Sequence, residues 1–132
     1  MLLLLTACSY SLQRDESRIA AAKKVFEAFN NHNWEAMADL YSDSALFLDP
    51  SFGKEYVSKT RKETIKKYSE MQKMFPDIHD TVKTIYPSGQ TVIVEFISTG
   101  TAPDGTKFTL PITSILTFKD GLIVKDATYY DL

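Results

Sequence analysis

Apolar residues recur at helical spacing in the first third of the chain. From Ser17, which can cap a helix, to residue 31 they return every three or four positions, as on the buried face of an amphipathic helix. The polar run NNHN ends this segment, and Asn33 can cap a second, short helix over residues 34–41. The apolar sides of the two helices are formed by Ile19, Ala22, Phe26 and Phe29, and by Trp34, Met37, Leu40 and Tyr41.

A short strand and a third helix are predicted next. The turn sequence SDS precedes the apolar run ALFLD at residues 45–49, which predicts a short strand. Residues 54–74 again show helical spacing, and Pro76 ends this helix because proline cannot continue it. The apolar side of this helix is formed by Val57, Ile65, Tyr68, Met71 and Phe75.

The pattern after Pro76 is typical of strands. Four apolar runs cover residues 77–86, 90–100, 106–118 and 122–131, and the turn sequences PSG, APDG and KDG separate them. Turns this short join antiparallel neighbours. Helices first and an antiparallel sheet afterwards indicate an α+β domain.

The second of these strands is apolar on both faces. Val92, Val94 and Phe96 share one face, and Ile93 and Ile97 share the other. The helices can cover only one face. The other face can meet a second subunit, which predicts a homodimer through the sheet face, or it can leave one or two isoleucines exposed.

Length and composition fit one globular domain. The chain has 132 residues, of which 44% are hydrophobic, enough for a single core. The net charge of -2 argues against nucleic acid as a partner, because phosphate binding needs a basic face. The lysine-rich stretch from Lys59 to Lys73 is interpreted as the solvated side of a helix.

The N-terminus predicts a lipid anchor. An apolar run precedes Thr6-Ala7-Cys8, and residues 5–8 resemble the lipobox of bacterial lipoproteins. The resemblance implies a signal and lipobox at residues 1–8, lipidation of Cys8, a polar tether at residues 9–16, and anchoring in the bacterial cell envelope. The alternative is a frayed apolar end on a cytoplasmic protein, because the basic n-region is absent and the apolar run is short.

Polar side chains interrupt the apolar faces of the last two strands. Ser114 lies in an apolar row, and its buried hydroxyl would need a partner, which can be another protein group such as neighbouring backbone, a water or a ligand. Asp126, Thr128 and Tyr130 share a face of the last strand. Asp126 and Tyr130 can hydrogen-bond a bound molecule if that face is concave; the alternative is a solvated strand end.

Histidine and cysteine are too few to indicate a metal site. The chain has two histidines and one cysteine. His32 is expected at a helix C-terminus, and His79, which opens a strand, is a candidate acid or base in a pocket. Motifs for nucleotides, dinucleotides and serine nucleophiles do not occur, so neither a metal nor a cofactor is expected.

The combined pattern resembles the SnoaL-like branch of the nuclear-transport-factor-2-like proteins. The resemblance covers residues 17–132 as one domain, and it rests on FNNHNWEAMADLYSDSALFLDP, MFPDIH, STGTAPDG and FKDGLIVKDATYYD. It implies three N-terminal helices packed on a strongly bent, mixed or antiparallel sheet that forms a cone-shaped pocket. The fold hosts isomerases, cyclases, epoxide hydrolases, dehydratases and non-catalytic binders, so it does not specify the function.

The resemblance also implies roles for single residues. In ketosteroid isomerases the Asp before Pro on this strand is the general base, and here that position is Asp49. The two positions that stabilise the enolate correspond to Val25 and Ser114, so steroid isomerisation is not expected. The acid that cyclases place on the last strand corresponds to Thr128, with Asp126 two residues earlier on the same face.

Two functions stay open. One is an enzyme for small apolar carbonyl compounds, with Asp49 as the base and Ser114, Tyr130 or His79 as hydrogen-bond donors. The other is a module that binds a small hydrophobic molecule or a protein partner without catalysis; a third alternative is a cone whose pocket is filled. Asp49 can also be a turn residue that accepts the amide of Ser51 or Phe52, and its pKa would then be lowered rather than raised.

Overall fold

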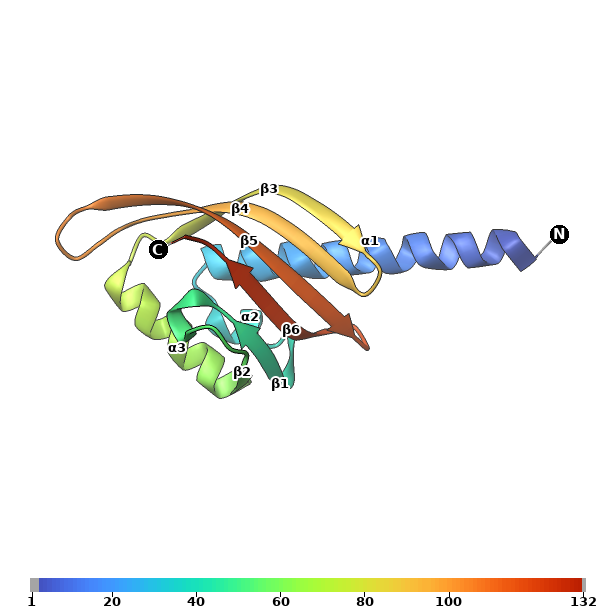
Figure 1. Cartoon of the computed structure of the whole chain (residues 1–132), viewed down its shortest axis with the longest axis horizontal. Helices are drawn as coiled ribbons and strands as arrows, with labels where there is room; N and C mark the ends of the chain where they lie inside the picture. Colours follow the sequence, from blue (N-terminus) through green and yellow to red (C-terminus); the bar gives the residue numbers. More distant parts are fainter. Residues whose placement is uncertain (1–2, 132) are drawn as a thin grey trace.

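Three α-helices and a six-stranded sheet make up residues 3–131, the part of the chain that the computed structural model describes (Figure 1). The helices are α1 (Leu3–Asn30), α2 (Trp34–Ala38) and α3 (Arg61–Met74), with a short 3₁₀ helix, η1, at Pro50–Phe52. The strands are β1 (Tyr41–Leu48), β2 (Val57–Thr60), β3 (His79–Ser88), β4 (Thr91–Thr101), β5 (Lys107–Lys119) and β6 (Leu122–Tyr129).

The sheet is mixed and strongly bent. Its strand order is β2-β1-β6-β5-β4-β3, and all neighbours are antiparallel except β1 and β6, which run parallel. The long strands β3, β4 and β5 curve over the helices in Figure 1. The predicted α+β class, with helices on one side of a bent sheet, is confirmed.

The core lies between α1 and the inner face of the sheet. Phe26 of α1 meets Phe96 of β4 edge-on, with ring centroids 4.7 Å apart. Val92 and Val94 are fully buried on the same face of β4, whereas Ile93 and Ile97 on the other face are only half-buried. The predicted division of this strand into two apolar faces is therefore correct.

The first helix begins earlier than predicted. Ser17 does not cap α1, because the helix begins at Leu3 and continues through residues 9–16, the predicted tether. Residues 3–16 contain no proline or glycine, so nothing in their sequence interrupts the helix. This first half of α1 projects beyond the sheet (Figure 1). None of the described helices is long and apolar enough to span a bilayer.

The third helix begins later than predicted. Residues 57–60 of the expected helix form β2, which pairs with β1, and α3 begins only at Arg61. Thr60 is the reason: its hydroxyl accepts the amide of Glu63 at 3.2 Å, while the Glu63 carboxylate accepts the amide of Thr60 at 2.8 Å. This capping box is visible in the sequence as TRKE.

Candidate functional site

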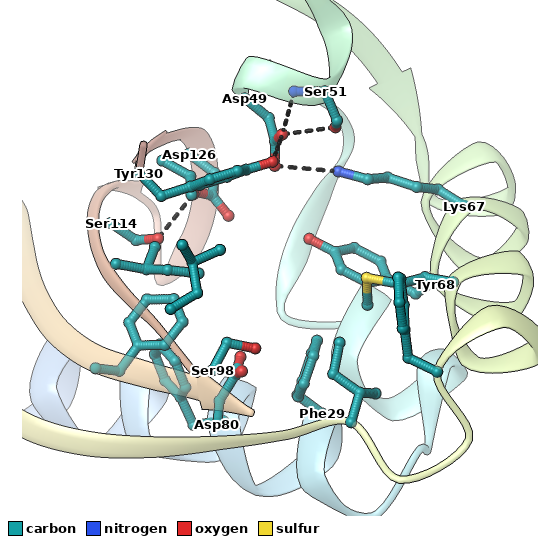
Figure 2. Close-up of a pocket in the computed structure, with 18 of the residues that line it drawn as sticks. Phe29, Asp49, Ser51, Lys67, Tyr68, Asp80, Ser98, Ser114, Asp126 and Tyr130 are labelled. Carbon is teal, nitrogen blue, oxygen red and sulfur yellow. Dashed lines mark hydrogen bonds and ion pairs between the residues drawn. The ribbon is translucent and has the colours of Figure 1, made fainter. Parts of the chain in front are cut away.

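The bent sheet, α1 and α3 enclose a cavity of about 860 Å³ (Figure 2). This volume lies in the range of small-molecule sites, so the alternative of a filled cone is wrong. Its apolar lining includes Val25, Phe26, Phe29, Met37, Phe75, Phe96, Phe108, Ile112 and Leu116. Its polar lining includes Asp49, Lys67, Tyr68, Asp80, Ser98, Ser114, Asp126, Thr128 and Tyr130.

Asp49 is both a turn residue and a cavity residue. Its carboxylate caps η1, because Oδ1 accepts the Ser51 amide at 2.8 Å and the Ser51 hydroxyl at 2.6 Å. The Tyr130 hydroxyl donates to the same oxygen at 2.8 Å, and Lys67 Nζ lies 3.4 Å from Oδ2. Figure 2 shows these groups together at one end of the cavity. The Asx turn predicted from the sequence is present.

These contacts make Asp49 a weak base. Burial alone would raise the pKa of Asp49, but the Lys67 ammonium and the hydrogen bonds from Ser51 and Tyr130 together lower it below its usual value. The carboxylate is therefore ionised at neutral pH, and it accepts a proton less readily than an ordinary aspartate. This direction is the one expected of a turn acid, not of a desolvated base.

Lys67 is a cavity residue that sequence reasoning missed. Its ammonium lies 4.0 Å from the centroid of the Phe52 ring and pairs with Asp49. Burial lowers the pKa of Lys67, and the attraction of Asp49 opposes that shift. The available signal is its position in α3, four residues before Met71, which places both side chains on one face of the helix.

Asp126 anchors a second group of hydrogen bonds on β6. The Tyr41 hydroxyl donates to Oδ2 at 2.7 Å, and the Thr128 hydroxyl donates to Oδ1 at 3.1 Å. The Ser114 and Thr128 hydroxyls lie 2.7 Å apart, and Ser114 is the donor because the single hydroxyl hydrogen of Thr128 is used on Asp126. Burial raises the pKa of Asp126, and the bonds from Tyr41 and Thr128 oppose that rise.

The predicted face of β6 therefore does line the cavity. Asp126, Thr128 and Tyr130 are all cavity residues, as is Ser114 on β5. The hydroxyl hydrogens of Ser114, Thr128 and Tyr130 are already directed at Thr128, Asp126 and Asp49, however, so none of these three is a free donor for a ligand.

Tyr68 supplies a free donor. Its hydroxyl points into the cavity (Figure 2), and it has no hydrogen-bond partner among the described residues. Burial, followed by the charges of Asp126 and Asp49, raises the pKa of Tyr68 well above its usual value. The phenol therefore keeps its proton. Helical spacing placed Tyr68 on the apolar side of α3, but spacing alone cannot distinguish a core tyrosine from a cavity tyrosine.

His79 is not a cavity residue, and its predicted role there is wrong. Alternation along β3 turns His79 outward, where it is exposed, and turns Ile78 and Asp80 inward. Asp80 is only 6% exposed, and its Oδ1 has no hydrogen-bond partner in the described part of the chain. Burial raises the pKa of Asp80 to about 6, and the Ser98 hydroxyl opposes part of that rise.

The remaining histidine has a structural role. His32 follows the last turn of α1, and its ring nitrogens lie 3.0 Å from the Ile78 carbonyl oxygen and 3.1 Å from Gln72 Nε2. These contacts tie the end of α1 to α3 and β3. Across residues 3–131 no group of three His, Cys, Asp or Glu side chains is arranged to hold a metal ion.

Comparisons with known proteins agree on one fold. The family model of the SnoaL-like domain matches residues 22–125. Similar solved structures include IdmH from Streptomyces antibioticus, a proposed polyketide cyclase (24% identity, TM-score 0.75, covering 86% of this chain and 91% of that one). An NTF2-like protein of unknown function from Burkholderia pseudomallei gives 15% identity and a TM-score of 0.77, covering 87% and 91%.

A third similar structure is a proposed isomerase from Bacillus subtilis, with 20% identity and a TM-score of 0.74 over 88% of this chain and 87% of that one. At these identities the likeness concerns the fold alone. No curated protein matches the chain.

Proposed function

This chain belongs to the SnoaL-like family, and from that premise we propose that it binds a small, largely apolar molecule in its cone-shaped cavity. The family fold supports a ligand-binding or isomerase-like role. The observation that carries the proposal is the cavity itself: about 860 Å³, lined mainly by aromatic and aliphatic side chains, with a few polar groups at fixed positions.

The polar groups at one end favour a ligand with a carbonyl oxygen. Tyr68 offers an unused hydroxyl donor there, and its high pKa keeps the proton on the phenol. Asp49, Tyr130 and Lys67 are held by one another, so they need little rearrangement when a ligand enters. An apolar ketone would accept a hydrogen bond from Tyr68 while its hydrocarbon part contacts the phenylalanines.

The fluorescent naphthyl ketone prodan tests this proposal. Prodan should bind the wild-type protein saturably, with a blue shift of its emission as it leaves water. Tyr68→Phe should weaken binding about three- to tenfold, the usual effect of losing one neutral hydrogen bond. Tyr86→Phe is the matched control, because Tyr86 is exposed outside the cavity.

Two results would count against the proposal in different ways. If prodan does not bind saturably to the wild-type protein, the cavity is not a site for apolar ketones. If Tyr68→Phe and Tyr86→Phe both bind prodan as the wild type does, the cavity binds ligands but Tyr68 does not orient them.

Proton transfer is a second candidate function, because Asp49 and Tyr68 line the same cavity. Asp49 would remove the proton α to a ligand carbonyl, the electron pair of that C–H bond would become the enolate, and Tyr68 would donate a hydrogen bond to the enolate oxygen. The lowered pKa of Asp49 weakens it as a base and is the reason that binding is the primary proposal.

Hydrogen exchange separates the two functions. The α-hydrogens of a tetralone in heavy water can be followed by NMR with and without protein. The binding proposal predicts exchange no faster than in buffer with the same concentration of protein carboxylates. Acceleration by the wild type that falls on the order of 100-fold in Asp49→Asn would establish catalysis instead.

The lipid anchor remains a proposal that rests on the lipobox resemblance. Cys8 is exposed near the start of α1, where an enzyme could reach its thiol. Mass spectrometry of the protein from a bacterial membrane fraction should show diacylglyceryl mass on Cys8. An unmodified Cys8 in a soluble fraction would contradict an envelope location.

A homodimer through the outer face of the sheet is also proposed. Ile93 and Ile97 are half-buried there, beside Ile115 on β5. Sedimentation should give twice the chain mass of 14.9 kDa, and Ile93→Lys should give the monomer because a lysine at the interface would lose its hydration. A wild-type protein that sediments as a monomer would contradict this interface.

A further inference from the structure

The end of the cavity opposite Asp49 carries a buried acid that has no counter-ion among residues 3–131. Asp80 of β3 and Ser98 of β4 are register partners, and they are 6% and 5% exposed. Figure 2 shows both side chains pointing into the cavity, across from the group of Asp49 and Lys67. Asp80 Oδ1 has no hydrogen-bond partner in the described part of the chain.

The position of Asp80 is fixed by its backbone. Asn30, the last residue of α1, donates its side-chain amide to the Asp80 carbonyl oxygen at 2.8 Å. The Asp80 amide donates to the Asn30 side-chain oxygen, also at 2.8 Å. This two-bond clamp fixes the backbone that carries the carboxylate before any ligand arrives, so less rearrangement is needed when a binding group enters.

Asp80 is ionised in most molecules above pH 7, since burial raises its pKa only to about 6. No salt bridge involves it within residues 3–131. The described lining contains two lysines: Lys67 is paired with Asp49, and Lys73 is exposed. A buried, unpaired carboxylate is costly, so a natural role for it is to be paired by a group that enters from outside.

The charge of the whole cavity favours a cation. Five acidic side chains line it against the two lysines, and they are Asp49, Glu70, Asp80, Asp126 and Asp131. Such a lining repels carboxylate and phosphate ligands and attracts positive ones.

Aromatic rings surround the same space. Phe96 precedes Ser98 on the inner face of β4 and contacts Phe26 of α1, and Phe29 lies one residue before the Asn30 clamp. All three rings line the cavity. Aromatic faces beside a carboxylate are the usual environment for a desolvated ammonium group, because the rings and the carboxylate both attract positive charge.

We propose that Asp80, Ser98 and the surrounding rings form an ammonium-binding subsite, so that the ligand of this cavity is a hydrophobic amine. The proposal rests on the function proposed above and names its ligand class. The ammonium would donate to Asp80 Oδ1 and to the Ser98 hydroxyl, and the rest of the ligand would extend along the phenylalanine rings toward Tyr68.

Two matched probes test the subsite by calorimetry at about pH 7.5. Naphthylmethylamine carries an ammonium at this pH, and naphthylmethanol has nearly the same shape with a neutral hydroxyl. The wild type should bind the amine at least about tenfold more tightly than the alcohol, as expected for a charge-assisted bond in place of a neutral one. Asp80→Asn should bring the two affinities to within about twofold of each other.

Asp43→Asn is the control, because it removes the same charge from an exposed side chain outside the cavity. It should keep the preference for the amine. Each result is the ratio of the affinities of one variant for the amine and for the alcohol. A variant that binds both probes more weakly therefore keeps the same ratio, and only a loss of the ammonium contact changes it.

The outcomes separate the two proposals. If the wild type binds the alcohol as tightly as the amine, the ammonium subsite is wrong and ligand binding by the cavity stands. If the preference survives in Asp80→Asn, the ammonium is held elsewhere and the subsite is again wrong. If neither probe binds the wild type, both proposals fail.

Discussion

Asp80→Asn should change the pH dependence of folding stability. As the pH rises from about 4 to about 8, the unfolding free energy of the variant should increase relative to that of the wild type by about 2–3 kcal/mol. This is the free energy that corresponds to raising the pKa of one carboxyl group from its ordinary value to about 6.

The direction of this change depends on whether the folded or the unfolded state binds the proton of Asp80 more tightly. The folded pKa of Asp80 is raised, so the folded state holds its proton to a higher pH than the unfolded state does. The wild type therefore has this contribution in full below about pH 4 and loses it as the pH rises through 6. Asparagine does not titrate, so the variant avoids that loss.

Urea unfolding at several pH values between 4 and 8 measures the difference, and about three points suffice to see the slope. Asp43→Asn serves as the control, since it removes the same charge from an exposed side chain. If the difference in unfolding free energy between the wild type and Asp80→Asn is the same at every pH, Asp80 is not desolvated. The buried acid of the proposed ammonium subsite would then be absent.

Tyr41→Phe should lower the unfolding free energy by about 1–3 kcal/mol at neutral pH. Tyr41 is 3% exposed, and its hydroxyl donates to Asp126 Oδ2 at 2.7 Å. Removing that donor leaves a buried carboxylate oxygen without its partner while the packing of the ring is kept.

Tyr68→Phe is the matched comparison for this effect. Its hydroxyl lies in the same cavity but has no hydrogen-bond partner in the described structure, so its removal should change stability by less than about 0.5 kcal/mol. Equal losses in the two variants would mean that the Tyr41 bond does not support Asp126. The pair also separates stability from binding, because only Tyr68→Phe should weaken the binding of prodan.

Much of the fold could be predicted from the sequence because its signals are local. Phe26 and Phe29 repeat at helical spacing, and Val92, Val94 and Phe96 alternate as a strand that is buried on one face does. Short turns made the neighbouring strands antiparallel. The parallel pairing of β1 with β6 joins residues far apart in the chain, and no local pattern reports it.

The candidate site was predictable only in part. Alternation placed Asp126, Thr128 and Tyr130 on one face, and the sequence Asp-Pro placed a turn at Asp49; the structure shows both features. His79 was predicted to be a cavity residue, which is wrong. The alternation of side chains along β3 turns His79 outward and turns the next residue, Asp80, inward.

The missed residues share a cause. Tyr68 was placed on an apolar helical face, where a core residue and a cavity residue give the same spacing. The hydrogen-bond partners that set the pKa of Asp49 come from Tyr130, which follows β6, and from α3 as well as from the turn, so its environment depends on the tertiary fold. The sequence pattern indicates which face of each helix or strand is buried, whereas the chemistry of a cavity depends on which of these faces meet in the folded protein.

We expect the cavity to hold a small apolar molecule, and an NMR titration of the labelled protein with prodan would locate that binding residue by residue. Chemical shifts of cavity residues such as Tyr68, Ser98 and Ile112 should move together and saturate at one ligand per chain. Shifts that do not saturate, or that gather at Ile93 and Ile97 on the outer face of the sheet, would contradict the claim.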